Sequence, residues 1–161
     1  FRAMKFQLRS YQKEASDAAV QAFQSTRKIN GLIIVSTGGG KSLIIADIAS
    51  RLNAPLIVLC PSKEILEQNY SKLQSYGIFD CGCYSASVGC KDINRITFAT
   101  IGSVINRMED FKHFKYVMID EAHVVNSKGG MYEKFINSQD RQVIGLTATP
   151  YRLNSYMEDQ C

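Results

Sequence analysis

Apolar residues recur along the chain with two spacings, one typical of helices and one typical of buried strands. Spacings of three and four residues predict a helix from about Ser10 to Gln24 with one buried face, formed by Leu8, Tyr11, Ala15, Ala18 and Ala22. A second helical pattern covers Ser42 to Leu52. A third begins after Ser62, a residue type that caps helix N-termini, and ends at Gly77.

Short apolar runs without in-and-out alternation lie between these helices. We expect them to be strands, at Leu32–Val35, Leu56–Cys60, Phe79–Tyr84, Ile96–Ala99, Val117–Ile119 and Val143–Leu146. Strands that are apolar throughout suit a sheet covered on both faces, and intervening helices suit parallel crossovers. The sequence therefore predicts an α/β fold, an open parallel sheet with helices on both faces. Ligands of such sheets bind beyond the carboxyl ends of the strands.

A glycine-rich segment follows the first of these strands and leads directly into a helix. It reads Ser36-Thr37-Gly38-Gly39-Gly40-Lys41-Ser42. Glycines let backbone N–H groups converge on phosphate oxygens, Lys41 can reach the β and γ phosphates, and Ser42 can bind Mg²⁺. Val35 occupies the position at which the strict phosphate-loop motif has its first glycine, so this segment matches a relaxed form of that motif. The alternative is a glycine-rich turn with a solvated lysine.

Two adjacent acids, Asp120 and Glu121, follow the apolar run Tyr116 to Ile119. A nucleotide hydrolase needs one carboxylate near Mg²⁺ and a second that orients the attacking water. We expect Asp120 in the first role and Glu121 in the second. Without the phosphate loop upstream, a solvated strand end is the more common interpretation of two such acids.

Three motifs, taken in the order in which they occur along the chain, resemble those of a known protein family. The glycine loop, Asp120-Glu121-Ala122-His123 and Thr147-Ala148-Thr149-Pro150 resemble those of superfamily 2 helicases in their first RecA-like lobe, a P-loop NTPase fold. The sequences of Leu8–Gln12 and Gly145–Arg152 are most similar to those of RadD-type repair helicases and of the helicase subunits of type III restriction enzymes. The resemblance extends from about Phe6 to Leu153, and it implies ATP and Mg²⁺ as cofactors.

The resemblance also implies roles for residues outside the hydrolysis site. Gln12 matches the glutamine that reads adenine, with an exposed amide at a helix start as the alternative. Five residues match the motifs that contact the nucleic-acid backbone, with plain helix caps as the alternative: Ser62, Lys63, Thr100, Gly102 and Ser103. His123, Thr147 and Thr149 resemble the relay between the hydrolysis site and the nucleic acid.

Length and composition fit one lobe of such an enzyme. The chain has 161 residues and a net charge of +4, and a chain of this size buries roughly 70% of its unfolded surface in one core. We expect Met4 to be the natural start, residues 1–3 to be an artificial extension and residues 4–161 to form a single N-terminal RecA-like ATP-binding lobe without its second lobe. No apolar run approaches the roughly 18–20 residues that span a bilayer.

The five cysteines, Cys60, Cys81, Cys83, Cys90 and Cys161, are odd in number, and no secretion signal opens the chain. We therefore expect reduced thiols in a cytoplasmic protein, rather than a zinc site at Cys81, Cys83 and Cys90, whose spacing lacks a C-x-x-C pair.

The combined expectation is a lobe that couples MgATP hydrolysis to movement on single-stranded or duplex DNA, with a second RecA-like lobe as partner. A restriction-type protein would add a nuclease or methyltransferase subunit. An RNA helicase lobe and a non-hydrolysing nucleic-acid-binding module are the alternatives.

Overall fold

The computed structural model describes residues 7–27, 30–35 and 40–147. Its helices are α1 (Ser10–Gln24), α2 (Lys41–Leu52), α3 (Lys63–Ser75), α4 (Ile101–Ile105) and α5 (Met131–Asn137), with 3-10 turns η1 (Met108–Phe111) and η2 (Ala122–Lys128). Its strands are β1 (Gly31–Ile34), β2 (Leu56–Leu59), β3 (Cys81–Ser85), β4 (Cys90–Lys91), β5 (Ile96–Ala99), β6 (Tyr116–Asp120) and β7 (Gln142–Thr147). The predicted helix Ser10–Gln24 and strand Ile96–Ala99 are confirmed to the residue.

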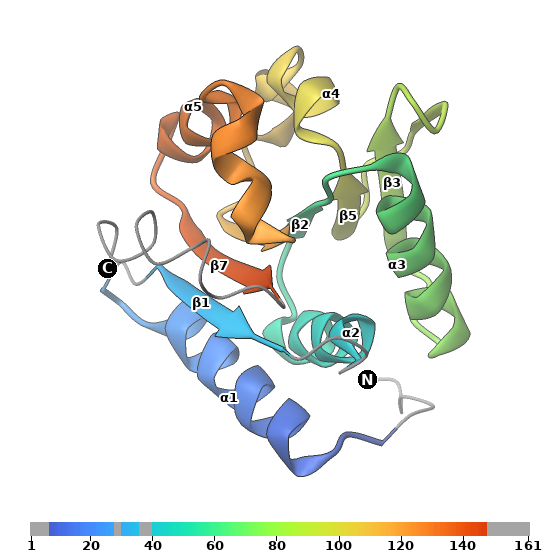
Figure 1. The fold of residues 1–161 in the computed structure, drawn as a ribbon, viewed down its shortest axis with the longest axis vertical. Coiled ribbons are helices and arrows are strands. Elements are labelled where there is room, and N and C mark those ends of the chain that lie inside the picture. The colour runs from blue at the N-terminus through green and yellow to red at the C-terminus, as the bar shows by residue number, and fades with distance from the viewer. Residues whose placement is uncertain (1–6, 28–29, 36–39, 148–161) are drawn as a thin grey trace.

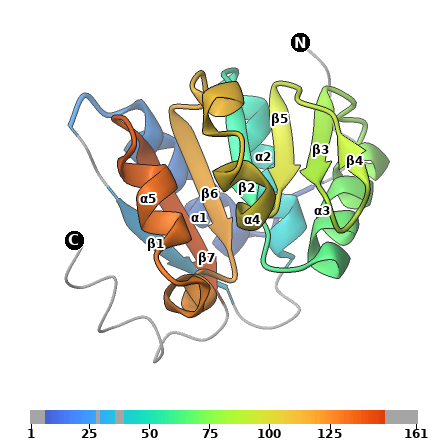
Figure 2. The ribbon, with the colours of Figure 1, turned by 90° about the horizontal axis from the view of Figure 1, so that it is seen from above.

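One sheet runs through the described residues in the order β1-β7-β6-β2-β5-β3-β4 (Figure 1 and Figure 2). All pairings are parallel except the last, where β4 returns antiparallel along β3. The predicted open parallel sheet is therefore confirmed, with one antiparallel edge strand added. The sequence pattern missed β4 because it is two residues long and carries no apolar run.

Helices cover both faces of this sheet, as predicted (Figure 2). Side chains of α1, α2 and α3 pack with one set of strand residues, which includes Leu56, Val58 and Met118. The alternate strand residues Ile57 and Val117 face a second cluster built on α4, η1 and α5. Because successive strand residues point to opposite faces, these two clusters are the two sides of one sheet. No helix among the described residues is long and apolar enough to cross a membrane.

The expectation that all the cysteines are reduced thiols is wrong for one pair. Cys83 and Cys90 form a disulfide that joins β3 to β4, with Cα atoms 5.7 Å apart. The antiparallel pairing of β3 and β4 brings the two residues together, and an apolar-pattern analysis could not reveal that pairing. Cys60 and Cys81 are free and buried, and burial raises the pKa of the Cys81 thiol to about 12. Cys161 lies outside the described residues.

Candidate ATP and nucleic-acid sites

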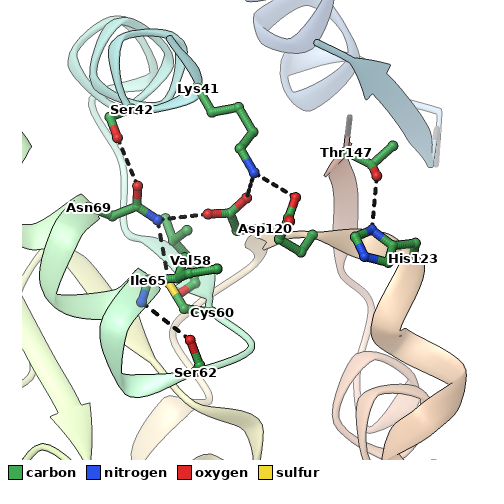
Figure 3. A network of polar contacts seen from close by, with 11 residues as sticks. Lys41, Ser42, Val58, Cys60, Ser62, Ile65, Asn69, Asp120, His123 and Thr147 are labelled. Atoms are coloured by element: carbon green, nitrogen blue, oxygen red, sulfur yellow. Dashed lines mark hydrogen bonds and ion pairs between the residues drawn. The ribbon is translucent and has the colours of Figure 1, made fainter. Parts of the chain in front are cut away.

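Lys41 and the two predicted acids meet at the carboxyl edge of the sheet. Lys41 Nζ lies 3.0 Å from Asp120 Oδ1 and 2.6 Å from Glu121 Oε1, although the acids are 79 and 80 residues further along the chain (Figure 3). Burial opposes the charged form of Lys41, but the charge of Asp120 and hydrogen bonds to both acids outweigh this effect and raise its pKa. The lysine is therefore a fixed cation at the edge where ligands of such sheets bind.

Glu121 has an unusual backbone conformation for its residue type. Its φ is +55°, in the left-handed region, where a non-glycine residue costs roughly 1–2 kcal/mol. It stands between the end of β6 and the start of η2, so the chain turns sharply directly after Asp120. Strained residues of this kind concentrate at active sites, where the surrounding structure holds them. The turn gives the two adjacent acids different surroundings, since Asp120 is 1% exposed while the Glu121 side chain is 25% exposed.

The oxygens near Lys41 fit a magnesium ion. Ser42 Oγ donates to Asn69 Oδ1 at 2.9 Å, and Asn69 Nδ2 donates to Asp120 Oδ2 at 2.8 Å, so one side chain bridges the two predicted ligands. No group of three His, Cys, Asp or Glu residues with metal-binding geometry occurs in the described part of the chain. Mg²⁺ does not need one, because it is commonly held by one or two carboxylates together with phosphate oxygens and water. A hydroxyl and a carboxylate are the hard oxygen donors that it prefers.

Asn69 was missed by the sequence analysis, although a signal was present. It lies three residues after Leu66 and four before Leu73, so it occupies the buried stripe of α3. A polar residue on an otherwise apolar stripe indicates a buried hydrogen-bonding role.

Gln12 lies against the last glycine of the loop rather than in solvent. It is 5% exposed, and its Oε1 accepts a hydrogen bond of 2.8 Å from the backbone N–H of Arg9. Gly40 has φ of +79°, and a Cβ atom added there would collide with the Gln12 side-chain nitrogen. The exposed-amide alternative is therefore wrong. Thr37, Gly38 and Gly39 lie outside the described residues.

Two of the three predicted relay residues, His123 and Thr147, lie in contact. His123 Nδ1 lies 3.0 Å from Thr147 Oγ1, which places η2 in contact with the end of β7 (Figure 3). Since β7 lies between β1 and β6 in the sheet, this contact is next to the Lys41 cluster. Thr149 lies outside the described residues.

The residues predicted to contact nucleic acid line one hollow of about 560 Å³. All five contribute to its wall: Ser62, Lys63, Thr100, Gly102 and Ser103. Ser62 also caps α3, since its Oγ accepts from the Ile65 N–H at 3.3 Å, so the helix-cap interpretation holds for it too. Thr100 makes no side-chain cap, and its hydroxyl instead contacts Ser85 and Ser103 at 2.9 and 3.2 Å.

The lining of this hollow is basic. Three further cations contribute to it, Lys91, Arg107 and Lys128, and its lining residues include no Asp or Glu. Lys91 is exposed to solvent, and the β3–β4 pairing places it at the wall of the hollow. A basic wall with hydroxyl donors suits a phosphate backbone.

Comparisons with known proteins agree with this architecture. The chain is 30% identical over 150 residues to the DNA 3'-5' translocase XPB2 of Sulfurisphaera tokodaii, which covers 92% of this chain and 32% of that protein. The Sulfolobus solfataricus SWI2/SNF2 ATPase core in complex with dsDNA matches with a TM-score of 0.73 and 21% identity, over 92% of this chain and 33% of that one. Saccharomyces cerevisiae Dbp5 bound to RNA and ADP BeF3 matches with a TM-score of 0.66 and 16% identity, over 94% and 48%.

The two solved structures establish the RecA-like helicase-lobe fold, and the chain spans about a third of the length of the curated relative. The family model for the type III restriction enzyme res subunit matches residues 5–152, nearly the whole chain. The chain belongs to this family of superfamily 2 ATP-dependent helicases, and it has the fold of their RecA-like ATP-binding lobe.

Proposed function

We propose that this chain binds MgATP at the Lys41 cluster and drives movement along DNA, together with a second RecA-like lobe. Lys41 and the backbone N–H groups at the start of α2 would hold the phosphates, and Ser42 and Asp120 would hold Mg²⁺. Glu121 would orient the attacking water. The ion supplies positive charge next to the transferring phosphoryl group, and the remaining tasks of binding and orientation belong to the chain's own residues.

One observation carries this proposal: Lys41 contacts both Asp120 and Glu121 at the carboxyl edge of the sheet. A phosphate-binding lysine, a metal-binding acid and a water-orienting acid must lie within one nucleotide's reach for hydrolysis. Their convergence from β6 and the N-terminus of α2 supports hydrolysis over a module that only holds nucleotide.

The basic hollow supports a nucleic-acid track on the same lobe. Its hydroxyls and cations suit phosphates, which carry no sequence information. Backbone contacts of this kind do not separate DNA from RNA, so RNA remains the rival substrate. We favour DNA because the name of the Sulfurisphaera relative specifies DNA translocation and because this relative matches 92% of the chain.

The test measures ATP hydrolysis by the complete protein with single-stranded DNA, duplex DNA and RNA as stimulators. Glu121→Gln should retain ATP binding and lose turnover, whereas Asp120→Asn should also weaken the dependence on Mg²⁺. Glu67→Gln, an exposed acid on α3, is the matched control and should behave as the wild type. Parental turnover in Glu121→Gln contradicts the assignment of the base, and stimulation by RNA alone contradicts the assignment of DNA.

A further inference from the structure

Asn69 is a buried amide outside the glycine loop, the Asp120–His123 segment and the residues that line the basic hollow. It lies on α3, two turns after the cap residue Ser62, and is 3% exposed. Burying an amide without hydrogen bonds costs about 1–3 kcal/mol by mutational measurements, so its presence on the apolar stripe needs a compensating set of contacts.

Those contacts lie in the nucleotide site. Oδ1 accepts from Ser42 Oγ at 2.9 Å, and Nδ2 donates to Asp120 Oδ2 at 2.8 Å and more weakly to Cys60 Sγ at 3.7 Å (Figure 3). The other oxygen of Asp120, Oδ1, faces Lys41. A single amide from a separate helix therefore contacts both residues assigned to Mg²⁺.

The chemistry of these groups fixes the direction of each hydrogen bond. An ionised carboxylate only accepts, so the NH₂ group of Asn69 must face Asp120 and its carbonyl oxygen must face Ser42. The Ser42 hydroxyl must then donate its proton toward Asn69. Both lone pairs of the Ser42 oxygen consequently remain available to a cation, which is the arrangement that a metal-binding hydroxyl needs.

We propose that Asn69 is a positioning residue for the magnesium site, which orients the Ser42 hydroxyl and holds the Asp120 carboxylate beside it. The inference rests on the proposed function and extends it to a residue that does not itself bind the ion. Groups that orient metal ligands in this way affect metal affinity or activity by about 10- to 100-fold when they are removed.

The test measures nucleotide binding rather than turnover. The complete chain is titrated by calorimetry with a non-hydrolysable ATP analogue over a range of MgCl₂ concentrations. In Asn69→Leu, which keeps the branched shape and the number of side-chain heavy atoms but has no polar group, the Mg²⁺ concentration for half-maximal enhancement of binding should rise about 10- to 100-fold. Nucleotide affinity in the absence of Mg²⁺ should not change, because Asn69 is assigned no contact with the nucleotide.

Two control variants separate positioning from fold stability. Leu73→Val reduces packing one turn further along the same buried face of α3 and should leave the Mg²⁺ requirement unchanged. Cys60→Ala removes only the weakest contact of Asn69 and should also leave it unchanged. Asn69→Ser, whose side chain is too short to reach both partners, provides a second substitution if Asn69→Leu does not fold. It should show the same shift.

The two proposals fail in distinguishable ways. If the wild type binds the analogue in a Mg²⁺-dependent manner and the folded Asn69 variants match it, the positioning role is overturned and the proposed function stands. If nucleotide binding to the wild type does not respond to Mg²⁺, both are overturned.

Discussion

The contact between Gln12 and Gly40 predicts that an alanine at position 40 is destabilising for two separable reasons. Gly40 has φ of +79°, and a Cβ atom there would collide with the Gln12 side-chain nitrogen. Gly89 offers a matched control, because its φ is +81° and a Cβ atom there would meet nothing within 4 Å. The two substitutions therefore share the backbone strain and differ in the collision.

The magnitudes follow from these contacts. An L-residue in the left-handed region costs roughly 1–2 kcal/mol, which applies to Gly40→Ala and Gly89→Ala alike. To escape the new Cβ atom, the buried Gln12 side chain must give up its hydrogen bond from the Arg9 N–H, worth about 1 kcal/mol. Gly40→Ala should thus cost about 2–3 kcal/mol in the wild type and about 1–2 kcal/mol in a Gln12→Ala background. Gly89→Ala should cost the same in both backgrounds.

Urea unfolding of the wild type, the three single variants and the two double variants measures these differences as a double-mutant cycle. Nucleotide titrations on the same proteins add a functional readout. If Gln12 reads adenine, Gly40→Ala should reduce the preference for ATP over GTP and Gly89→Ala should not. An identical cost of Gly40→Ala with and without Gln12 would refute the proposed contact between the two residues.

Four further outcomes are expected. Lys41→Ala should remove most ATP binding in calorimetry, whereas the exposed Lys72→Ala should not. Arg141→Met should lower the free energy of unfolding by roughly 3 kcal/mol or more in urea, because this buried guanidinium donates to three backbone carbonyls and one hydroxyl, and a buried acceptor left without a donor costs about 1–3 kcal/mol. Lys91→Ala should weaken binding of single-stranded DNA. It should also reduce the steepness with which the logarithm of the binding constant falls with the logarithm of the salt concentration, by about 0.7 per lost phosphate contact. The 161-residue chain alone should hydrolyse ATP slowly, since an arginine supplied by a second lobe is worth about 10³–10⁵ in rate, and DNA-stimulated turnover near about one per second would contradict this.

The central strands and long helices could be predicted because their patterns are local. Ile96–Ala99 is fully buried and apolar except for Thr97, and Ser62 caps α3 as its residue type predicts. The end of β1 departs from this pattern, since Ile34 is 55% exposed and β1 is an edge strand of the sheet that the described residues form. The two-residue strand β4 carries no apolar run, and the seven-residue helix α5 has too few turns for a helical period to appear.

The candidate site was predictable where its residues belong to a short motif. Lys41 lies beyond the end of β1 and Asp120 is the last residue of β6, and the parallel sheet places those strand ends at one edge. Asn69 and Lys91 belong to no such motif. Their positions depend on how α3 packs beside α2 and on the return of β4 along β3, which are contacts between distant parts of the chain.

Helix α3 physically connects the two candidate sites. Its N-terminal residues Ser62 and Lys63 line the basic hollow, and Asn69, two turns later, bridges Ser42 and Asp120. A helix transmits a shift of one end to the other because its backbone hydrogen bonds resist bending. A displacement of α3 by a nucleic acid in the hollow would therefore move the amide that holds the two oxygens assigned to Mg²⁺. The His123–Thr147 contact brings η2 to the end of β7 beside the Lys41 cluster, so two separate elements border the candidate nucleotide site.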